Sequence, residues 1–378
     1  MDRWDAGSGA GRRCERIDSR ASGPVRSTGR RARSGSRSHL PLGRDRQRPA
    51  AHPVNLGPGK EFDRIRAIIA RVAEITGDGS GLGDDCALIP LGATTLALSI
   101  DSSVEDVHFR TDWLDFKEIG FRAAGSAFSD LAADGASPIG VLVSIGLPTA
   151  DGKEGGDTDP AAEIMAGVAT MARNLAARVL GGDLTRADKY SVDVCVLGTA
   201  DHPVRRSGAR EGDALWVTGY LGGAALALER LRDGQRMSTP LRNRFACPEP
   251  RIAAGRWLAQ HGATAMIDIS DGLSADAQHL SAASGVGIEI NLEHIPCWEG
   301  VEAMAAVASG EEFELLVTMP PTFGDASASA FRGETGMELS RIGTCMRSTG
   351  GRRGGVRLLD RNKPVPLPQG YDHFASPQ

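Results

Sequence analysis

The sequence has few aromatic residues, no closely paired cysteines and no long apolar run. Phe, Trp and Tyr make up only 5% of the 378 residues, so Ala, Val, Leu and Ile must form most of a core. The six cysteines are scattered without a C-x-x-C pair, which favours free thiols in a reducing cytosol over a disulfide framework. Without 18 consecutive apolar residues or a signal-peptide core, we expect a cytoplasmic location and no membrane association.

The common nucleotide and metal motifs are also missing. The chain contains no G-x-x-x-x-G-K-[ST], no G-x-G-x-x-G and no H-E-x-x-H. It also lacks the H-R-D and D-F-G motifs of protein kinases. If this chain uses ATP, it must hold the phosphates with glycine backbone and metal ions.

Charge is distributed unevenly along the chain. Residues 1–50 hold 13 Arg and five acidic residues, whereas the whole chain has a net charge of −5, so the other 328 residues carry −13. This balance disfavours nucleic-acid binding by the folded part. The Arg-, Ser-, Gly- and Pro-rich composition predicts a disordered extension over residues 1–58. That extension could bind a polyanion such as RNA, be a solvated tail, or result from translation upstream of the true start.

Periodicity after residue 58 predicts interleaved helices and strands. Helical spacing is clear at residues 61–75, 117–136 and 161–179, and strands are expected at 86–91, 94–101, 139–148, 178–184 and 190–200. A strand, a glycine turn and a helix follow at 213–231, and a strand, an acidic turn and a helix at 264–285, with further strands at 287–292 and 313–320. We therefore predict an α/β fold with mixed sheets, divided into an N-terminal domain at 59–200 and a C-terminal domain at 201–378.

Several aspartates are predicted to lie where strands end or helices begin. Asp84 and Asp85 precede a strand, and the others are Asp101, Asp130, Asp183, Asp268 and Asp271. Strand ends meet at the edge of a sheet, so these side chains could gather in space. Any one of them could instead be a helix cap or turn residue. Their recurrence favours a shared metal site.

A group of carboxylates without matching lysines needs cations. Two charges roughly 4 Å apart repel by about 4 kcal/mol at an effective dielectric near 20. Divalent cations relieve this repulsion, and oxygen ligands favour Mg²⁺ or Ca²⁺. Because Mg²⁺ completes its shell with water and phosphate oxygens, the pattern points to a nucleotide triphosphate.

Ten segments in order resemble the thiamine-monophosphate kinases, within the superfamily of the aminoimidazole ribonucleotide synthetases. The resemblance extends from about Gly59 to Pro377. It rests on GKEFDRI, GLGDDCALI, LALSIDSSVEDVHF, IGFRAAGSAFSDLAADGASP, LGGDLTR, RRSGAREGD, CPEPRIAAG, IDISDGLSADAQHL, SGEEFELLVT and GYDHFASP.

The resemblance implies a two-domain fold like that of aminoimidazole ribonucleotide synthetase, with dimerisation through the N-terminal sheet. It implies that ATP phosphorylates thiamine monophosphate to thiamine diphosphate by direct in-line transfer assisted by several Mg²⁺ ions. The implied residues fall into four overlapping groups. Those implied to bind metal are Asp84, Ser99, Ile100, Asp101, Asp130, Asp183, Asp268 and Asp271, and Asp84, Asp130 and Asp271 are the catalytic ones. Those implied to contact ATP are Gly182, Asp183, Arg206 and Ser270, and those implied to contact thiamine monophosphate are His108, Glu311 and Tyr371.

Some positions differ from the family pattern. Ile100 replaces a Thr, so a metal ligand there could come only from the backbone, and Asp106 replaces a Gly. SGEEFELL stands where GGEDYELL is usual, which changes Ser309, Glu312 and Phe313. Next to Asp84, we expect Asp85 to orient the turn or a metal-bound water.

Other functions stay open at this level. Another ATP-using enzyme of the superfamily is possible, although a selenophosphate synthetase would need a reactive Cys in a glycine-rich segment, and Cys14 lies in the Arg-rich extension. An aminoimidazole ribonucleotide synthetase would lack the YDHF ending. A protein that binds nucleotide or metal without catalysis would be favoured by the loss of two or more of these aspartates.

Overall fold

A computed structural model describes residues 55–78, 81–148, 159–348 and 354–374. The expected extension at residues 1–54 lies outside these ranges. Residues 55–58 were assigned to the same extension, but they are described, and Gly57 is buried. Residues Ala50–Gln378 form one compact unit, which is the part considered below.

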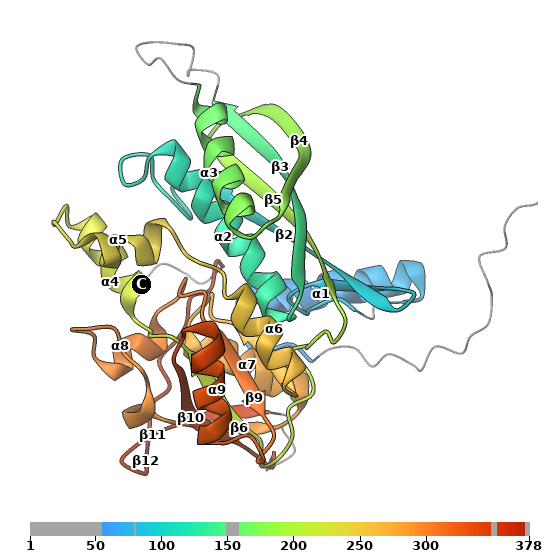
Figure 1. Ribbon diagram of the computed structural model, residues 1–378, viewed down its shortest axis with the longest axis vertical. Helices are drawn as coiled ribbons and strands as arrows, with labels where there is room; N and C mark the ends of the chain where they lie inside the picture. Colours follow the sequence, from blue (N-terminus) through green and yellow to red (C-terminus); the bar gives the residue numbers. More distant parts are fainter. Residues whose placement is uncertain (1–54, 79–80, 149–158, 349–353, 375–378) are drawn as a thin grey trace, which may run out of the picture. The chain divides into compact units, whose positions relative to one another are not determined.

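A five-stranded sheet occupies the first half of this unit, in the order β1-β2-β5-β3-β4. Only β3 and β4 pair in parallel, so the sheet is mixed. Its strands are β1 (Ala87–Leu91), β2 (Thr94–Val104), β3 (Ser137–Pro148), β4 (Arg178–Ala187) and β5 (Ser191–Ala200). Helices α2 (Phe116–Ala133) and α3 (Pro160–Asn174) pack together, and α2 covers one face of β2 and β5 (Figure 1).

A seven-stranded sheet follows, in the order β12-β11-β8-β10-β6-β9-β7. Its strands are β6 (Ala214–Thr218), β7 (Ala265–Asp268), β8 (Gly287–Asn291), β9 (Leu315–Met319), β10 (Leu339–Met346), β11 (Gly355–Asp360) and β12 (Lys363–Val365). The helices of this half are α4 (Gly223–Arg232), α5 (Thr239–Ala246), α6 (Ile252–Gln260), α7 (Leu273–Ser284), α8 (Ala303–Ala308) and α9 (Asp325–Thr335). The two sheets, each with its own helices, confirm the predicted mixed α/β architecture.

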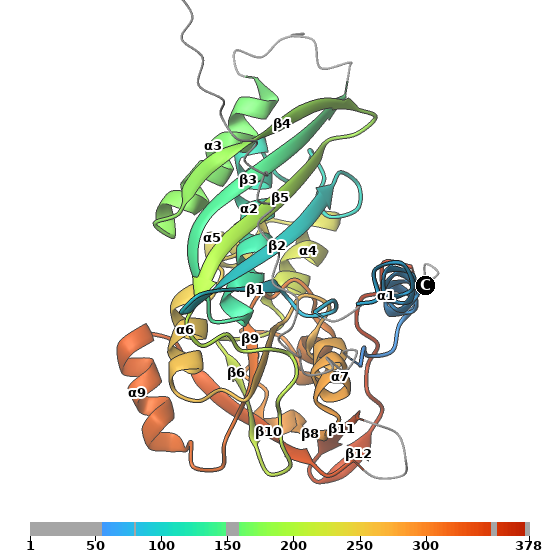
Figure 2. The same cartoon turned by 90° about the vertical axis from the view of Figure 1, so that its right-hand side faces the viewer.

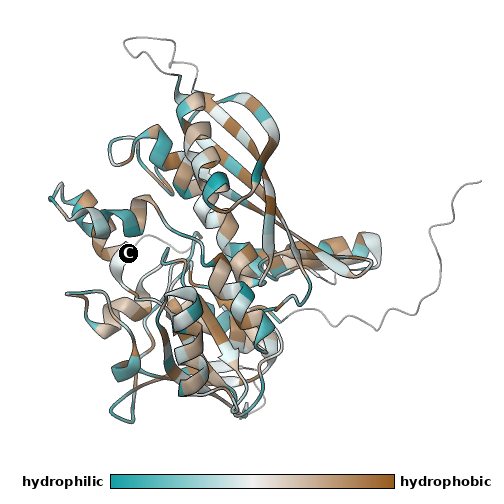
Figure 3. Ribbon diagram, viewed as in Figure 1, coloured by the Kyte–Doolittle hydropathy of each residue, from teal (hydrophilic) through white to brown (hydrophobic). Residues whose placement is uncertain are grey.

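Helix α2 connects the two halves. Its start is fixed by a capping box, in which Asp115 accepts from the Glu118 amide and Glu118 accepts from the Asp115 amide. Most of its residues are buried, and it packs against β2 and β5 on one side and against β7 and α6 on the other. One hydrophobic cluster therefore contains side chains from both sheets, such as Val141 and Leu315. Figure 3 shows the alternation of hydrophobic and polar residues along the strands of the five-stranded sheet.

Helix α1 (Lys60–Thr76) confirms the helix predicted from its apolar spacing, but none of its residues is fully buried. Phe62 and Ile65 line a cavity, whereas Ile68 and Ile75 are exposed. No helix in the described ranges has the length and apolar content needed to cross a bilayer.

The aspartates do not all lie where the sequence pattern predicts. Asp101 lies inside β2 and Asp183 inside β4, while Asp130 lies in the last turn and a half of α2. Strand ends therefore do not bring Asp101 and Asp130 together. They meet because α2 crosses the face of β2 on which the Asp101 side chain lies.

Candidate active site

One cavity of about 800 Å³ is lined by nearly all of the predicted site residues. They come from β2, α2, the turn before α7, the segment before β9 and the C-terminal segment. The lining includes Asp84, Ser99, Ile100, Asp101, His108, Asp130, Arg206, Asp268, Ser270, Asp271, Glu311 and Tyr371. Of the predicted residues, only Gly182 and Asp183 are absent from it.

Three carboxylates form the centre of this cavity. Asp85, Asp130 and Asp268 each offer an oxygen within 4.8 Å of the other two. Ser129 Oγ donates to Asp268 at 2.6 Å, and Ser99 donates to Asp130. Carboxylate oxygens at this separation are a suitable ligand set for Mg²⁺.

The electrostatics of the group require a counter-charge. Burial, followed by the nearby Asp101 and Asp268, raises the pKa of Asp130 well above its usual range. Burial and then Asp85 raise the pKa of Asp268 to about 7. In the metal-free protein, Asp130 and Asp268 therefore keep their protons to a higher pH than exposed aspartates do. A divalent cation would replace the protons and keep the carboxylates ionised.

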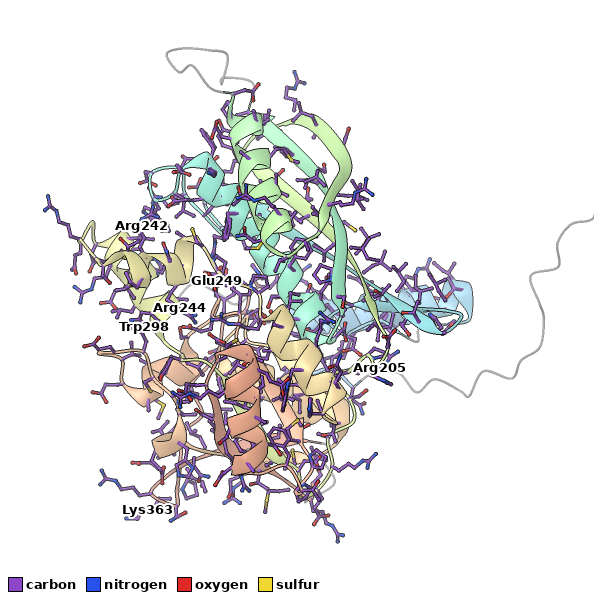
Figure 4. All side chains as sticks on the ribbon, viewed as in Figure 1. Arg205, Arg242, Arg244, Glu249, Trp298 and Lys363 are labelled. Atoms are coloured by element: carbon purple, nitrogen blue, oxygen red, sulfur yellow. The ribbon has the colours of Figure 1, made fainter. Side chains whose placement is uncertain are left out.

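The adjacent Asp84 and Asp85 have different partners. Asp85 accepts from Arg206 Nη2 at 2.7 Å and from Nε at 3.1 Å, and its side chain is almost fully buried. Asp84 accepts from the Arg206 backbone amide at 2.9 Å, and Arg205 lies 3.5 Å from its other oxygen (Figure 4). Of the two, Asp85 is the one grouped with Asp130 and Asp268. The family resemblance pointed to Asp84, whose side chain is as buried as that of Asp85 and lines the same cavity, so Asp84 stays a predicted ligand.

Gly182 and Asp183 are not part of this cavity. Asp183 is exposed and pairs in register with Ser144 of β3. At Gly182 an added Cβ would lie 1.8 Å from the Val143 carbonyl oxygen, so packing alone requires a glycine there. Within one chain, Gly182 and Asp183 therefore do not share a cavity with Arg206 and Ser270, the other residues predicted to contact ATP.

Ile100 lines the cavity, but its side chain is 72% exposed and cannot ligate a metal. It lies on the face of the sheet opposite Ser99 and Asp101, since side chains alternate along β2. Asp106, at a position where the family usually has Gly, has a left-handed backbone with φ of 65°. That conformation explains why glycine is suited to this turn.

The lining of the cavity also includes aromatic and charged side chains. His108 Nδ1 accepts from the Val104 amide at 3.1 Å, and its ring lies 5.1 Å from that of His373. The Tyr371 and His373 rings are 4.8 Å apart. Burial lowers the pKa of His108 to about 4, so its imidazole is neutral at pH 7. Together the three rings form an aromatic wall.

Glu311 also lines the cavity and is held from two sides. Arg122 of α2 donates to its carboxylate, and the Glu311 amide donates to the Ser270 carbonyl at 2.6 Å. Its φ of 58° is unusual for a residue other than glycine and marks local strain of the kind found at binding sites.

The chain beyond Glu311 is anchored by buried charges. Arg244 donates to Glu312 at 2.7 Å and lies beside Trp298 (Figure 4). Arg251 donates to Glu314 at 2.6 Å. This ion-pair network fixes the segment that presents Glu311 to the cavity.

Sequence reasoning missed several functional candidates. They are Asp85 as a member of the carboxylate group, Arg122, His373, Asp276 and His279. The D-x-x-H spacing of Asp276 and His279 was a readable signal, whereas Arg122 and His373 carried none, because their roles depend on distant partners.

The two halves match two family models. Residues 83–200 match the AIR synthase related protein, N-terminal domain, and residues 210–354 match the AIR synthase related protein, C-terminal domain. The chain is 31% identical to the thiamine-monophosphate kinase of Rhodopirellula baltica over 314 residues, covering 78% of this chain and 90% of the relative. The chain belongs to the thiamine-monophosphate kinase family. The enzyme from Salmonella typhimurium is likewise 31% identical, over 84% of this chain and 96% of its own length.

Solved structures of the family show the same fold. AaThiL complexed with AMPPCP and TMP superposes with a TM-score of 0.69 at 27% identity, covering 84% of this chain and 97% of that chain. The predicted two-domain fold of the superfamily is thereby confirmed. The predicted domain boundaries and the individual site residues stay predictions.

Proposed function

We propose that this chain transfers the terminal phosphoryl group of ATP to the phosphate of thiamine monophosphate, which gives ADP and thiamine diphosphate. The observation that carries the proposal is a shared space: the carboxylate group and the aromatic wall line one cavity. Membership of the family and the relative bound to AMPPCP and TMP support it. The ATP phosphates would lie at the carboxylate end and the thiamine rings at the aromatic end.

The carboxylate group fits Mg²⁺, since Asp85, Asp130 and Asp268 present buried oxygens close together. We propose that Asp84, Asp101 and Asp271, which line the same cavity, contribute further ligands. Bound Mg²⁺ would neutralise the charge of the phosphates during transfer. The acceptor is a phosphate oxygen that is already anionic at pH 7, so no side chain has to act as a general base. The neutral His108 is consistent with that chemistry.

The protein residues would mainly position the two anions. Arg206 lines the cavity and is fixed by Asp85, so it can direct its remaining N–H groups at phosphate oxygens. Ser270 lies in the turn before α7 and lines the cavity next to Asp271. At the other end, Tyr371 can stack on a thiamine ring, and Glu311 can accept from the aminopyrimidine or attract the thiazolium charge.

The exposed face of the five-stranded sheet supports a homodimer. Ile100, Cys195 and Leu142 are paired across β2, β5 and β3 on the face that α2 and α3 leave uncovered (Figure 2). An apolar row of this kind is expected to be buried against another surface. We propose that a second copy covers it, and that Gly182 and Asp183 contribute to an active site only in that dimer, because they lie outside the cavity of their own chain.

The decisive experiment is a kinase assay with purified protein, ATP, Mg²⁺ and thiamine monophosphate, followed by detection of thiamine diphosphate. Unphosphorylated thiamine serves as the alternative acceptor, and ATP without acceptor tests for simple hydrolysis. Formation of thiamine diphosphate is expected. If neither thiamine compound is phosphorylated, the substrate assignment is wrong, and another ATP-dependent reaction of the superfamily becomes the better hypothesis.

Asp130→Asn tests the carboxylate group within the same assay. We expect kcat to fall by about 100-fold or more, because a preorganised charge is removed from the reacting centre. In chelator its melting temperature should stay close to that of the wild type, because the raised pKa keeps Asp130 protonated and uncharged in the metal-free protein. Asp325→Asn, at an exposed position in α9, is the matched control and should keep full activity. Undiminished turnover in Asp130→Asn would remove Asp130 from the site.

A further inference from the structure

A second group of potential metal ligands lies beside the carboxylate group. Asp271, Asp276 and His279 each offer a ligand atom within 4.8 Å of the other two. Asp271 directly precedes the N-cap of α7, and the other two are three residues apart in that helix. Residues at this spacing project from the same face of a helix. A carboxylate and a histidine at i and i+3 are also the ligand pair that di-iron helical proteins use.

Two of these side chains are buried without partners. Asp276 is 2% exposed and His279 is 5% exposed. Asp276 Oδ2 and His279 Nδ1 have no hydrogen-bond partner among the residues that the structure describes. Buried polar atoms are nearly always paired, since leaving one unpaired costs about 1–3 kcal/mol and more when the group is charged. The observation therefore points to a ligand that is not part of the polypeptide.

The surroundings hold the imidazole in place. The Phe62 ring of α1 stacks on the His279 ring at 3.7 Å, and the Gly57 backbone packs so closely that an added Cβ there would lie 2.3 Å from Nδ1. A separate cavity of about 220 Å³ is lined by Asp271, His279 and residues of α1 and the C-terminal segment. That space adjoins two of the three residues, Asp271 and His279, and can hold water molecules next to them.

We propose that Asp271, Asp276 and His279 bind a divalent transition-metal ion, of the class of Mn²⁺ or Zn²⁺, at a site separate from the Asp85–Asp130–Asp268 group. Imidazole nitrogen favours these ions over Mg²⁺ and Ca²⁺, which prefer oxygen ligands. The site shares Asp271 with the proposed active site. It does not depend on the identity of the phosphate acceptor, because it consists of protein ligands alone.

The test uses the full chain, stripped with chelator and then loaded with Mn²⁺ alone, without nucleotide. Electron paramagnetic resonance detects coupling between bound Mn²⁺ and a ligating ¹⁴N nucleus, a signal that carboxylate ligands cannot give. We expect this coupling in the wild-type protein and its loss in His279→Gln. His108→Gln and His373→Gln, which alter the histidines of the larger cavity, are matched controls and should keep the coupling. Asp276→Asn should bind one Mn²⁺ ion fewer than the wild type in equilibrium dialysis.

Absence of nitrogen coupling in the wild type at saturating Mn²⁺ would overturn the proposal, and so would undiminished coupling in His279→Gln. The wild-type measurement needs no variant, so absence of coupling there would overturn the proposal even if a variant fails to fold. Circular dichroism would establish that each variant is folded. A protein that shows the coupling but does not phosphorylate thiamine monophosphate would keep this site and lose the proposed function. A protein that phosphorylates thiamine monophosphate but does not show the coupling would keep the proposed function and lose this metal site.

Discussion

At the scale of single residues, the site is governed by where carboxylates are buried rather than by how many there are. Asp84 and Asp85 are neighbours in sequence, yet Asp85 pairs with the Arg206 guanidinium and Asp84 with its backbone amide. A substitution at Asp84 or Asp85 is therefore expected to remove a carboxylate from the cavity and to change the position of Arg206. The same principle makes the metal-free protein sensitive to pH.

Stability of the metal-free protein should decrease as the pH rises. The pKa values of Asp268 and Asp271 are raised from 3.8 to about 7, in each case chiefly by burial. Between these values the unfolded chain releases the protons and the folded chain retains them. The stabilisation is complete below about pH 4 and is lost as the pH passes through about 7. Thermal melts in chelator should show a melting temperature that falls across this interval.

Two comparisons isolate the cause of that pH dependence. Asp268→Asn should give a flatter profile, because its amide does not titrate. Added Mg²⁺ should restore stability most strongly above pH 7, where the carboxylates are ionised. A wild-type profile no steeper than that of Asp268→Asn would show that Asp268 does not titrate in this range.

At the scale of elements, α2 determines the site more than any other segment. It contributes Arg122, Ser129 and Asp130, and it contacts both sheets. Its position depends on α3, which approaches so closely that only glycine fits between the helices. An added Cβ at Gly120 would lie 1.9 Å from the Ile164 carbonyl oxygen.

Gly120→Ala should therefore destabilise the protein, by about 1–3 kcal/mol or more, since the two helix backbones must move apart. Chemical denaturation measures this change in the free energy of unfolding. Gly333→Ala is the matched control, because Gly333 lies inside α9 with nothing within 4 Å of an added Cβ. It should stabilise the protein by roughly 0.5–1 kcal/mol. Equal effects of the two substitutions would contradict the proposed close packing.

At the scale of the whole molecule, the uncovered face of the five-stranded sheet is the feature that a single chain does not explain. Along β5 the buried residues Val192, Val194 and Val196 alternate with side chains that are only half-buried. On the same face, Cys195 of β5 is paired with the exposed Ile100 of β2 and Leu142 of β3. This face is where the proposed dimer would form.

Leu142→Asp should convert the proposed dimer into a monomer, because it places a charge in the centre of the apolar row. Light scattering coupled to size-exclusion chromatography measures the mass in solution. Met346→Asp introduces the same change at an exposed position in β10 of the other sheet and should leave the dimer intact. A wild-type protein that is monomeric at assay concentration would refute the dimer, and with it a role for Asp183 in the site.

The sequence by itself predicted the strands and helices of the N-terminal half and the class of the fold, and its family resemblance pointed to a set of residues that line the cavity. Hydrophobic periodicity is local and survives in a list of residues, as α1 and β2 show. Only the tertiary structure decided that Asp85 joins Asp130 and Asp268, that Asp183 lies on an exposed strand, and that Asp276 and His279 are buried without partners. The reason is physical: burial and the distances between carboxylates depend on how α2 and α7 pack against distant segments, and the spacing of residues along the chain does not contain that packing.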